Sequence, residues 1–303
     1  MVREAEKKGM LALISSLVED AGVPQSDIYI AEPSRFITDN IYNYCHARYP
    51  EVHFVDNAGG DGREKSEYAA DRMHYSADNG QLATGIARVF TDADYIINMA
   101  LVKGHVGQGV TLCGKNWYGA MSIDADWRKN FHNNFDQARD GQPKYITFID
   151  FMGHPDLGGK TMLYLIDGML GSRSVDGKPS PKWSIEPFDG DWPCSLFASQ
   201  DPVAIDMVAL DLLTAQFPDM PDTHYSDMYL LEAATAGISA GELAAKGVSN
   251  SGTTYTPGGD GKALTSLGVA EHSPNAWPRK YSRNLGPDEG IELIYTRLAS
   301  PVK

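Results

Sequence analysis

The chain has 303 residues and a formal charge of −14 at pH 7. This length allows one large α/β domain or two ordinary ones, and the excess of carboxylates argues against nucleic acid or an anionic membrane surface as a partner. No run of about 18 apolar residues is present, so the sequence predicts a soluble protein without a membrane-spanning helix. Its three cysteines are far apart and give neither a disulfide framework nor the spacing of a zinc site.

The first third of the chain alternates between predicted helices and strands. Apolar residues at helical spacing predict an amphipathic helix over 3–21, and a short strand follows at 28–30. Ser34 as an N-cap predicts a second helix that ends before Pro50, and the next strand covers 52–55. This alternation is typical of a parallel sheet covered by helices.

Longer apolar segments follow in the middle of the chain. Residues 95–102 are typical of a buried strand, and a second apolar strand over 162–166 ends in Asp167-Gly168. A short strand at 196–199 precedes a long helix over about 202–216. We therefore expect both long strands in the same sheet.

Two segments are expected outside this framework. Residues 124–144 are polar with few apolar anchors, and we interpret them as a lid, with a surface insertion packed elsewhere as the alternative. Residues 247–303 are turn-rich and predict an irregular C-terminal region. The predicted architecture is a single α/β domain over 1–303 with a mostly parallel sheet covered by helices.

Cationic and amide side chains cluster around the end of the strand at 95–102. Ligands of open α/β sheets bind outside the carboxyl ends of the strands, so the cluster predicts a site for an anionic or oxygen-rich ligand. A helix that starts after Gly109 would add backbone donors. The alternative is a glycine-rich surface loop with solvated lysines. The candidate residues are Asn98, Lys103, His105, Lys115 and Asn116.

Carboxylates form the second group of candidates. Asp206 lies on a helix that is apolar on nearly every face, so we expect it to be buried and paired with a cation, a metal or amides. Asp201 precedes Pro202, so a helix N-cap is the alternative to a role in a site. Asp167 follows a strand and could bind a metal, although Asp-Gly is also an ordinary turn.

Metal ligands are available elsewhere as well. Asp150, His154 and Asp156 carry suitable donor atoms, but their spacing matches no specific template, and solvated loop residues are the alternative. The sequence leaves a divalent metal open and identifies no cofactor. It predicts no iron–sulfur cluster, because the cysteines lack the required spacing.

The two clusters together resemble the family known as domain of unknown function 362. Its pattern is an apolar strand with Asn, then Lys-x-His, then Thr-Leu-x-x-Lys-Asn-x-x-Gly, an Asp-Gly after a second strand, and Ser-x-Asp-Pro-Val-Ala-x-Asp. The resemblance covers about 10–240 and adds Ser199 as a supporting residue. It implies a shared site rather than a reaction, because the activity of the family is not established. The matching residues are Asn98, Lys103, His105, Thr111, Leu112, Lys115, Asn116, Gly119, Asp167, Gly168, Ser199, Asp201, Pro202, Val203, Ala204 and Asp206.

This chain departs from the family pattern in three respects. The first strand with Lys-Pro-Asn is absent, so we expect an N-terminally shortened chain. The ferredoxin-like cysteine segment of some members is also absent, which argues against a redox role. The twin-arginine leader of others is missing too, and a composition rich in Tyr, Asn, Asp and Gly favours an exported protein without its leader over a cytoplasmic one.

A weaker likeness is to the nickel-pincer lactate racemases. In these enzymes a strand is followed by a His, then by a glycine-rich stretch with a cofactor-holding Lys, and later by a His on nickel. His105, Lys115 and His132 occur in that order here. The double-glycine signature before the lysine is replaced by Leu112-Cys113-Gly114. The likeness is therefore an analogy.

We expect an enzyme that acts on a small anionic or polyhydroxylated substrate, with the reaction and the oligomeric state left open. Lys103 and Lys115 would hold the anionic group, His105 would act as general acid or base, and Asn116 would donate to an oxyanion. Asp167 or Asp201 would orient these groups or bind a divalent ion. Isomerase and oxidoreductase chemistry stay open. The alternatives are a non-catalytic carboxylate- or sugar-binding protein and a racemase or epimerase like the nickel-pincer enzymes.

Overall fold

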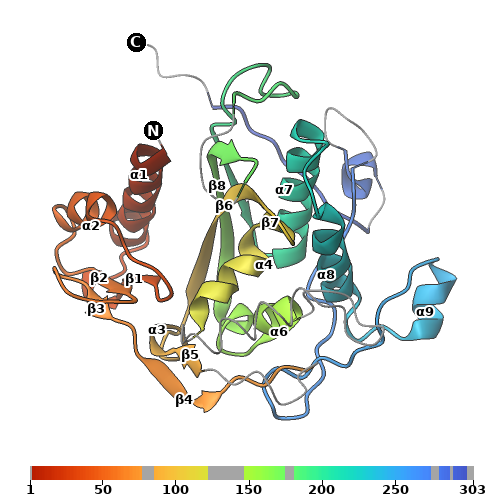
Figure 1. Ribbon diagram of the computed structural model, residues 1–303, viewed down its shortest axis with the longest axis horizontal. Helices are drawn as coiled ribbons and strands as arrows, with labels where there is room; N and C mark the ends of the chain where they lie inside the picture. The colour runs from red at the N-terminus through yellow and green to blue at the C-terminus, as the bar shows by residue number, and fades with distance from the viewer. Residues whose placement is uncertain are drawn as a thin grey trace.

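Three separate sheets organise the part of the chain that the computed structural model describes, residues 2–76, 85–121, 147–174, 181–273, 280–286 and 289–298. The sheets are a three-stranded parallel sheet, β1-β2-β3, a two-stranded ribbon, β4-β5, and a four-stranded sheet, β7-β6-β8-β9 (Figure 1). The predicted α/β class is therefore confirmed, but the strands do not form one sheet. The predicted lid at 124–144 lies outside the described residues.

The N-terminal layer, residues 2–65, combines the parallel sheet with two helices and an apolar core of its own. Its strands are β1 (Tyr29–Glu32), β2 (His53–Asp56) and β3 (Glu64–Lys65), and its helices are α1 (Val2–Ser15), continued by η1 (Ser16–Asp20), and α2 (Asp39–His46). The predicted first helix is confirmed. The core side chains are Ile14, Ile28, Ile37, Cys45, Tyr49, Val52 and Phe54.

The predicted N-cap of the second helix is wrong. Helix α2 begins at Asp39, with Thr38 at the N-cap position. Ser34 lies instead in a turn, in which the Arg35 N–H donates to the Glu32 carbonyl at 3.1 Å. Proline has a fixed φ and no backbone N–H, so Pro33 suits this turn, and the helix begins after it.

The central sheet is mixed rather than mostly parallel. Strand β6 (Ile96–His105) runs parallel to β8 (Thr161–Ser172), whereas β7 (Gly109–Thr111) and β9 (Ser195–Ser199) are antiparallel to their neighbours. The short connection over 106–108 permits only an antiparallel hairpin between β6 and β7. The two long apolar strands lie side by side in this sheet.

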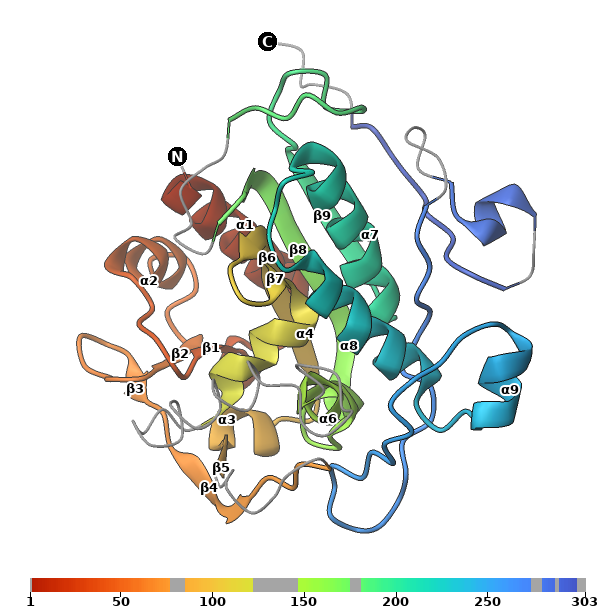
Figure 2. The same ribbon diagram turned by 45° about the vertical axis from the view of Figure 1, so that its right-hand side comes forward.

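Helices cover both faces of the central sheet. Helix α1 lies on one side, and the other side is covered by the helices that Figure 2 shows in front of the strands. A Cβ built at Gly9 of α1 would lie 3.6 Å from Met99 Cε of β6, so the N-terminal layer packs closely on this sheet. The helices on the opposite side are α4 (Cys113–Asn116), α6 (Thr147–Gly153), α7 (Pro202–Gln216) and α8 (Thr223–Thr235).

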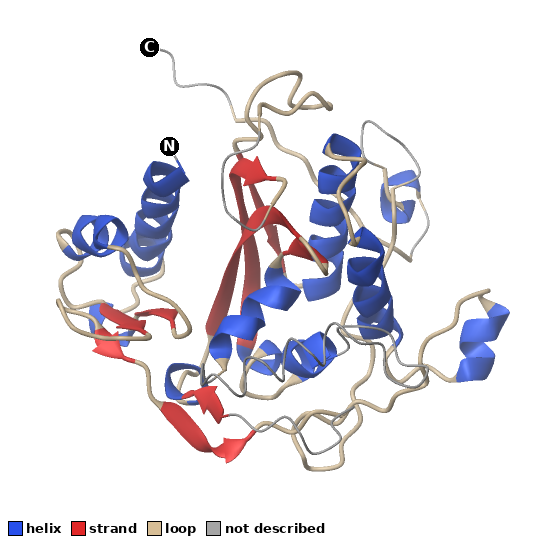
Figure 3. Ribbon diagram, in the orientation of Figure 1, coloured by secondary structure: helices blue, strands red, loops and turns tan. Residues whose placement is uncertain are grey.

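The described part of the C-terminal region is irregular, as predicted. It follows α9 (Ala240–Ala245), and within it only η5 (Ser282–Leu285) is helical among the described residues (Figure 3). No described helix is both long and apolar enough to cross a membrane. The remaining elements are η2 (Gln25–Asp27), β4 (Tyr68–Arg72), β5 (Gly85–Ala87), α3 (Arg88–Thr91), η3 (Trp117–Ala120) and η4 (Gly158–Lys160).

Candidate functional site

Strand β6 presents its polar residues on two different faces. Buried and half-buried positions alternate strictly along it, which places Lys103 and His105 on the face of Met99 and places Asn98 on the opposite face. Lys103 pairs across the hairpin with Thr111, whose hydroxyl donates to the Lys103 carbonyl at 3.2 Å. The cationic candidates of β6 therefore face the side on which the N-terminal layer packs.

Asn98 and Asn116 join β6 to α4. Asn98 Nδ2 donates to the Cys113 carbonyl at 3.1 Å. Asn116 Nδ2 donates to Asn98 Oδ1 at 2.8 Å and to the Met99 carbonyl at 3.2 Å. These bonds hold α4, which also carries the half-buried Lys115, against the strand. The convergence of Lys115 with His105 on one ligand stays a prediction.

Asp206 is fully buried and paired, as its apolar helix predicts. Its carboxylate accepts from the Cys113 N–H at 2.9 Å and from the Gly114 N–H at 2.8 Å, and Tyr229 OH lies 3.4 Å away. Burial raises its pKa to about 7, and the two amide donors oppose this rise. Its partners are thus the first amides of α4 and not the lysines, so Asp206 positions the helix that carries Lys115.

Asp201 and Ser199 have the contacts of a helix start. Asp201 Oδ1 accepts from the Val203 and Ala204 N–H groups, both at 2.8 Å, and Oδ2 accepts from the Val269 N–H at 2.9 Å. Ser199 Oγ accepts from the Asp201 N–H at 2.9 Å. Burial raises the pKa of Asp201, and the three amide donors lower it. These contacts support the N-cap interpretation of Asp201.

Asp167 lies inside β8 rather than at its end. The strand continues to Ser172 because Asp167 and Gly168 pair with β9, so the predicted strand end is wrong. Asp167 is buried, shares the face of Leu101 and accepts from the Met169 N–H at 2.8 Å. Burial raises its pKa, and the amide donor lowers it. The carboxyl group lies near α1, since a Cβ at Gly9 would be 3.9 Å from its Oδ2.

The other proposed metal ligands are engaged with nearby groups. Asp150 accepts from the Ser76 N–H at 3.0 Å and from its hydroxyl at 2.5 Å. His154 Nδ1 accepts from the Asp156 N–H at 3.0 Å, and burial lowers the pKa of this imidazole. Among the residues that the structure describes, no group of three or more His, Cys, Asp or Glu side chains could hold a metal ion. A divalent metal stays a prediction that rests on the sequence.

Sequence reasoning missed the loop that faces Lys103 from the N-terminal layer. This loop, residues 32–35, begins at the last residue of β1, and Tyr68 OH of β4 donates to its Pro33 carbonyl at 3.1 Å. A Cβ built at Gly119 of η3 would lie 3.1 Å from Ser34 Oγ and 3.5 Å from Glu32 Oε1. The loop therefore packs directly on the segment that follows α4.

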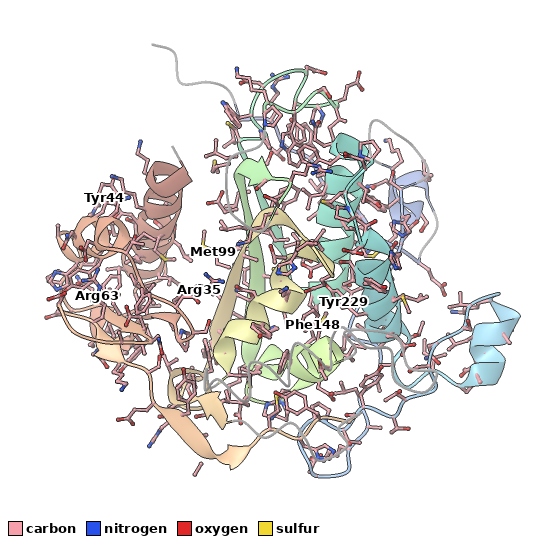
Figure 4. All side chains as sticks on the ribbon, in the orientation of Figure 1. Arg35, Tyr44, Arg63, Met99, Phe148 and Tyr229 are labelled. Atoms are coloured by element: carbon pink, nitrogen blue, oxygen red, sulfur yellow. The ribbon has the colours of Figure 1, made fainter. Side chains whose placement is uncertain are left out.

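The side chains of this loop bring opposite charges to the boundary. Burial raises the pKa of Glu32, and the positive charges of Arg35 and Lys103, with a hydrogen bond to Ser34, oppose the rise. Arg35 is exposed, and Figure 4 shows it with Met99 between the N-terminal layer and β6. One sequence signal was available, because Glu-Pro-Ser-Arg follows the carboxyl end of a predicted strand, as Lys103 and His105 do.

The arrangement offers anion binding together with proton transfer. Two cations from different layers act on one carboxyl group, and the imidazole of His105 lies two residues beyond Lys103, with Nδ1 2.5 Å from the Val106 carbonyl. A carboxyl group whose pKa is raised holds its proton more readily than an exposed glutamate, and it can serve as an acid or a base. The candidate site is therefore the boundary between the 32–35 loop, the end of β6 and η3.

Comparison with known proteins agrees with the motif analysis. No curated protein and no solved structure gives a significant match to this chain. The likeness to the nickel-pincer lactate racemases is not confirmed. A family model does match residues 67–211, a range that contains β6, α4, β8 and most of α7 and excludes the 32–35 loop. The matching model is that of the family described as Domain of unknown function (DUF362), the family that the motifs of this chain resemble.

Proposed function

We propose that the protein is an enzyme that binds a small anionic or polyhydroxylated substrate at the boundary between β6 and the N-terminal layer. The proposal is supported by the positive charges of Lys103 and Arg35, which act on the Glu32 carboxyl group from two layers, in a chain whose net charge is −14. Cations are scarce in this protein, so two of them acting on one carboxyl group favour a site for an anion.

Each residue has a role that follows from its position. Lys103 and Arg35 bind the anionic group of the substrate, and Lys115 of α4 contributes a further charge. His105 acts as general acid or base. The Asn116 amide, already held by Asn98 Oδ1, positions α4 and presents this helix to the ligand. Asp206 and Asp201 are positioning residues, since their carboxylates hold backbone amides.

A thermal-shift screen tests the binding part of the proposal. Sulfate, malonate, tartrate and simple sugars are added to the wild-type chain, with sodium chloride at matched ionic strength as reference. We expect one or more anions to raise the Tm of wild type, and Lys103→Met to weaken binding at least tenfold. This loss corresponds to the charge-assisted hydrogen bond of about 1.5–3 kcal/mol that the lysine would make.

Lys246→Met is the matched control, because this exposed lysine follows α9 at a distance in the sequence from every candidate residue. It removes the same charge and should leave anion affinity unchanged. Equal loss in both variants would mean that the anions respond to net charge alone, and the site assignment would then be abandoned.

His105→Gln separates an enzyme from a non-catalytic binding protein. Ligands found in the screen are incubated with wild type and with the variant, and their conversion is followed by proton NMR. An enzyme loses turnover while its affinity stays within a few-fold of wild type. Unchanged ligand spectra with wild type, together with retained affinity in the variant, would support the binding protein instead.

A further inference from the structure

The face of the central sheet that carries Lys103 is apolar along most of its length. On β6 the residues of this face are all half-buried, and the strand registers identify their neighbours on β8 and β9. A sheet face that meets water usually carries polar side chains, so this face requires a cover. Its apolar members are Ile97, Met99, Leu101, Leu163, Leu165, Leu196 and Ala198.

The described chain covers this face only in part. A Cβ at Gly9 of α1 would lie 3.6 Å from Met99 Cε and 3.9 Å from Asp167 Oδ2, so α1 lies against β6 and β8 at this point. Figure 4 shows Met99 on the side of β6 that faces the N-terminal layer. On β9, however, the Leu196 side chain is 58% exposed. The apolar side chains of this face pack in neither of the two hydrophobic cores that the described residues form.

The basic residues of this face lie at one end of its apolar row. Lys103 and His105 follow Leu101 on the same face of β6, so the row changes there from apolar to basic. The rise along a strand places Lys103 about 20 Å from Ile97, at the opposite end of the row. Asp167 pairs with Leu101 and would repel an anion beside it if it were ionised. An anionic group is therefore best placed at the Lys103 end.

We infer that the anion bound at Lys103 carries an apolar chain, and that this chain lies along Ile97, Met99 and Leu101. This inference rests on the proposed function and deepens it, because it narrows the substrate class to an amphiphilic anion. The apolar chain would remove these half-buried side chains from water, which favours binding. A polyhydroxylated ligand would lose water along the row without finding hydrogen-bond partners among these side chains.

A chain-length series on wild type tests the inference without any substitution. Acetate, butanoate, hexanoate, octanoate and decanoate are titrated below their micelle-forming concentrations, and affinity is measured by isothermal titration calorimetry. We expect the affinity to rise about two- to fourfold per added methylene from butanoate to decanoate. The neutral 1-octanol should bind about tenfold more weakly than octanoate, because it lacks the charge that the lysine would bind.

Two substitutions separate the apolar chain from the anionic group. Leu101→Thr places a polar, β-branched residue that suits a strand in the row, and it should lower octanoate affinity about fivefold and butanoate affinity by less than about twofold. Lys103→Met should weaken all the carboxylates by a similar factor and leave the gain per methylene unchanged. Leu285→Thr is the control, because Leu285 is 56% exposed in η5, outside the central sheet. It should behave like wild type throughout.

The outcomes distinguish the two proposals. Anion binding that gains nothing from chain length, or a gain per methylene that Leu101→Thr leaves unchanged, overturns the role of the apolar row and leaves the anion site standing. No binding of any carboxylate, of sulfate or of malonate overturns the proposed function, and the inference with it. A chain-length gain without any loss of affinity in Lys103→Met would place the ligand elsewhere and overturn both. If Leu101→Thr does not fold, as judged by circular dichroism, the wild-type series decides alone.

Discussion

Asp206→Asn is the substitution whose effect the structure defines most closely. The wild-type carboxylate is fully buried and accepts from the Cys113 and Gly114 N–H groups. Asparagine retains one oxygen for these amides and places an NH2 group beside the other. We expect this mismatch to cost about 1–3 kcal/mol at any pH, the usual penalty for a buried donor that loses its acceptor.

A second, pH-dependent term comes from the ionisation of the wild-type residue. Its pKa is raised by burial from 3.8 to about 7 in the folded state. The protonated carboxyl group therefore favours the fold at low pH, and this contribution is lost as the pH rises from about 4 through about 7. A difference of about three pKa units corresponds to roughly 4 kcal/mol. Asparagine does not titrate, so this term is absent from the unfolding free energy of the variant.

Urea unfolding of both proteins between pH 4 and pH 8 measures this term. All other groups titrate in both proteins, so their effects cancel in the difference between the two unfolding free energies. We expect that difference to move by roughly 4 kcal/mol in favour of Asp206→Asn as the pH rises. Asp94→Asn, at an exposed position, is the control. A difference that stays constant within about 1 kcal/mol, or moves the other way, would show that the two amides outweigh burial, and our reasoning would fail.

Two further substitutions test packing and an ion pair. A Cβ at Gly104 would overlap the Arg173 carbonyl oxygen and lie 2.7 Å from Met220 Sδ, so we expect Gly104→Ala to lower the urea-unfolding free energy by about 1–3 kcal/mol. Gly241→Ala in α9, where the added Cβ meets open space, should be neutral or stabilising by up to about 1 kcal/mol. The pKa of His272 is raised to about 10 by Asp211 and then by Asp227. We expect His272→Gln to lower the unfolding free energy by about 1 kcal/mol below pH 6.5, a small value because this side chain is exposed. The difference from wild type should disappear as the pH rises through about 10. A difference that persists at pH 11 would contradict the ion-pair explanation.

The features that the sequence predicts correctly are those that depend on local pattern. Asp206 has apolar neighbours around its helix, and burial with a partner follows from that periodicity alone. The strands β6 and β8 themselves follow from two long apolar runs. The N-terminal parallel sheet follows from alternating helices and strands.

The features that it misses depend on contacts between distant segments. Strand β9 joins the central sheet antiparallel to β8, a choice that no local pattern in Ser195–Ser199 signals. The electrostatic effect of Lys103 on Glu32 acts between residues of different layers, and the loop that begins at Glu32 packs on η3. The sequence could not identify the partner of Asp206, because backbone amides and a lysine can both donate hydrogen bonds to a buried carboxylate.

Several carboxylates of this acidic chain accept hydrogen bonds from its irregular C-terminal region. Segments without helix or strand leave backbone N–H groups that need acceptors, and carboxylates supply them. Asp211 accepts from the Ser273 N–H at 2.8 Å, and Glu271 accepts from the Ser282 and Ile291 N–H groups at 2.6 and 2.7 Å. Glu232 accepts from the Ser251 N–H and hydroxyl, and from Tyr255 OH at 3.0 Å.

These contacts also explain why a count of carboxylates is a poor guide to the site. Asp206, Asp201, Asp211 and Glu271 all hold backbone amides and are committed to the fold. Glu32 differs from these four carboxylates, because the positive charges of Arg35 and Lys103 and a hydrogen bond to Ser34 favour its ionised form. The kind of donor, more than burial or the direction of the pKa shift, therefore separates a structural acid from a candidate functional one here, since burial raises the pKa of Asp201, Asp206 and Glu32 alike.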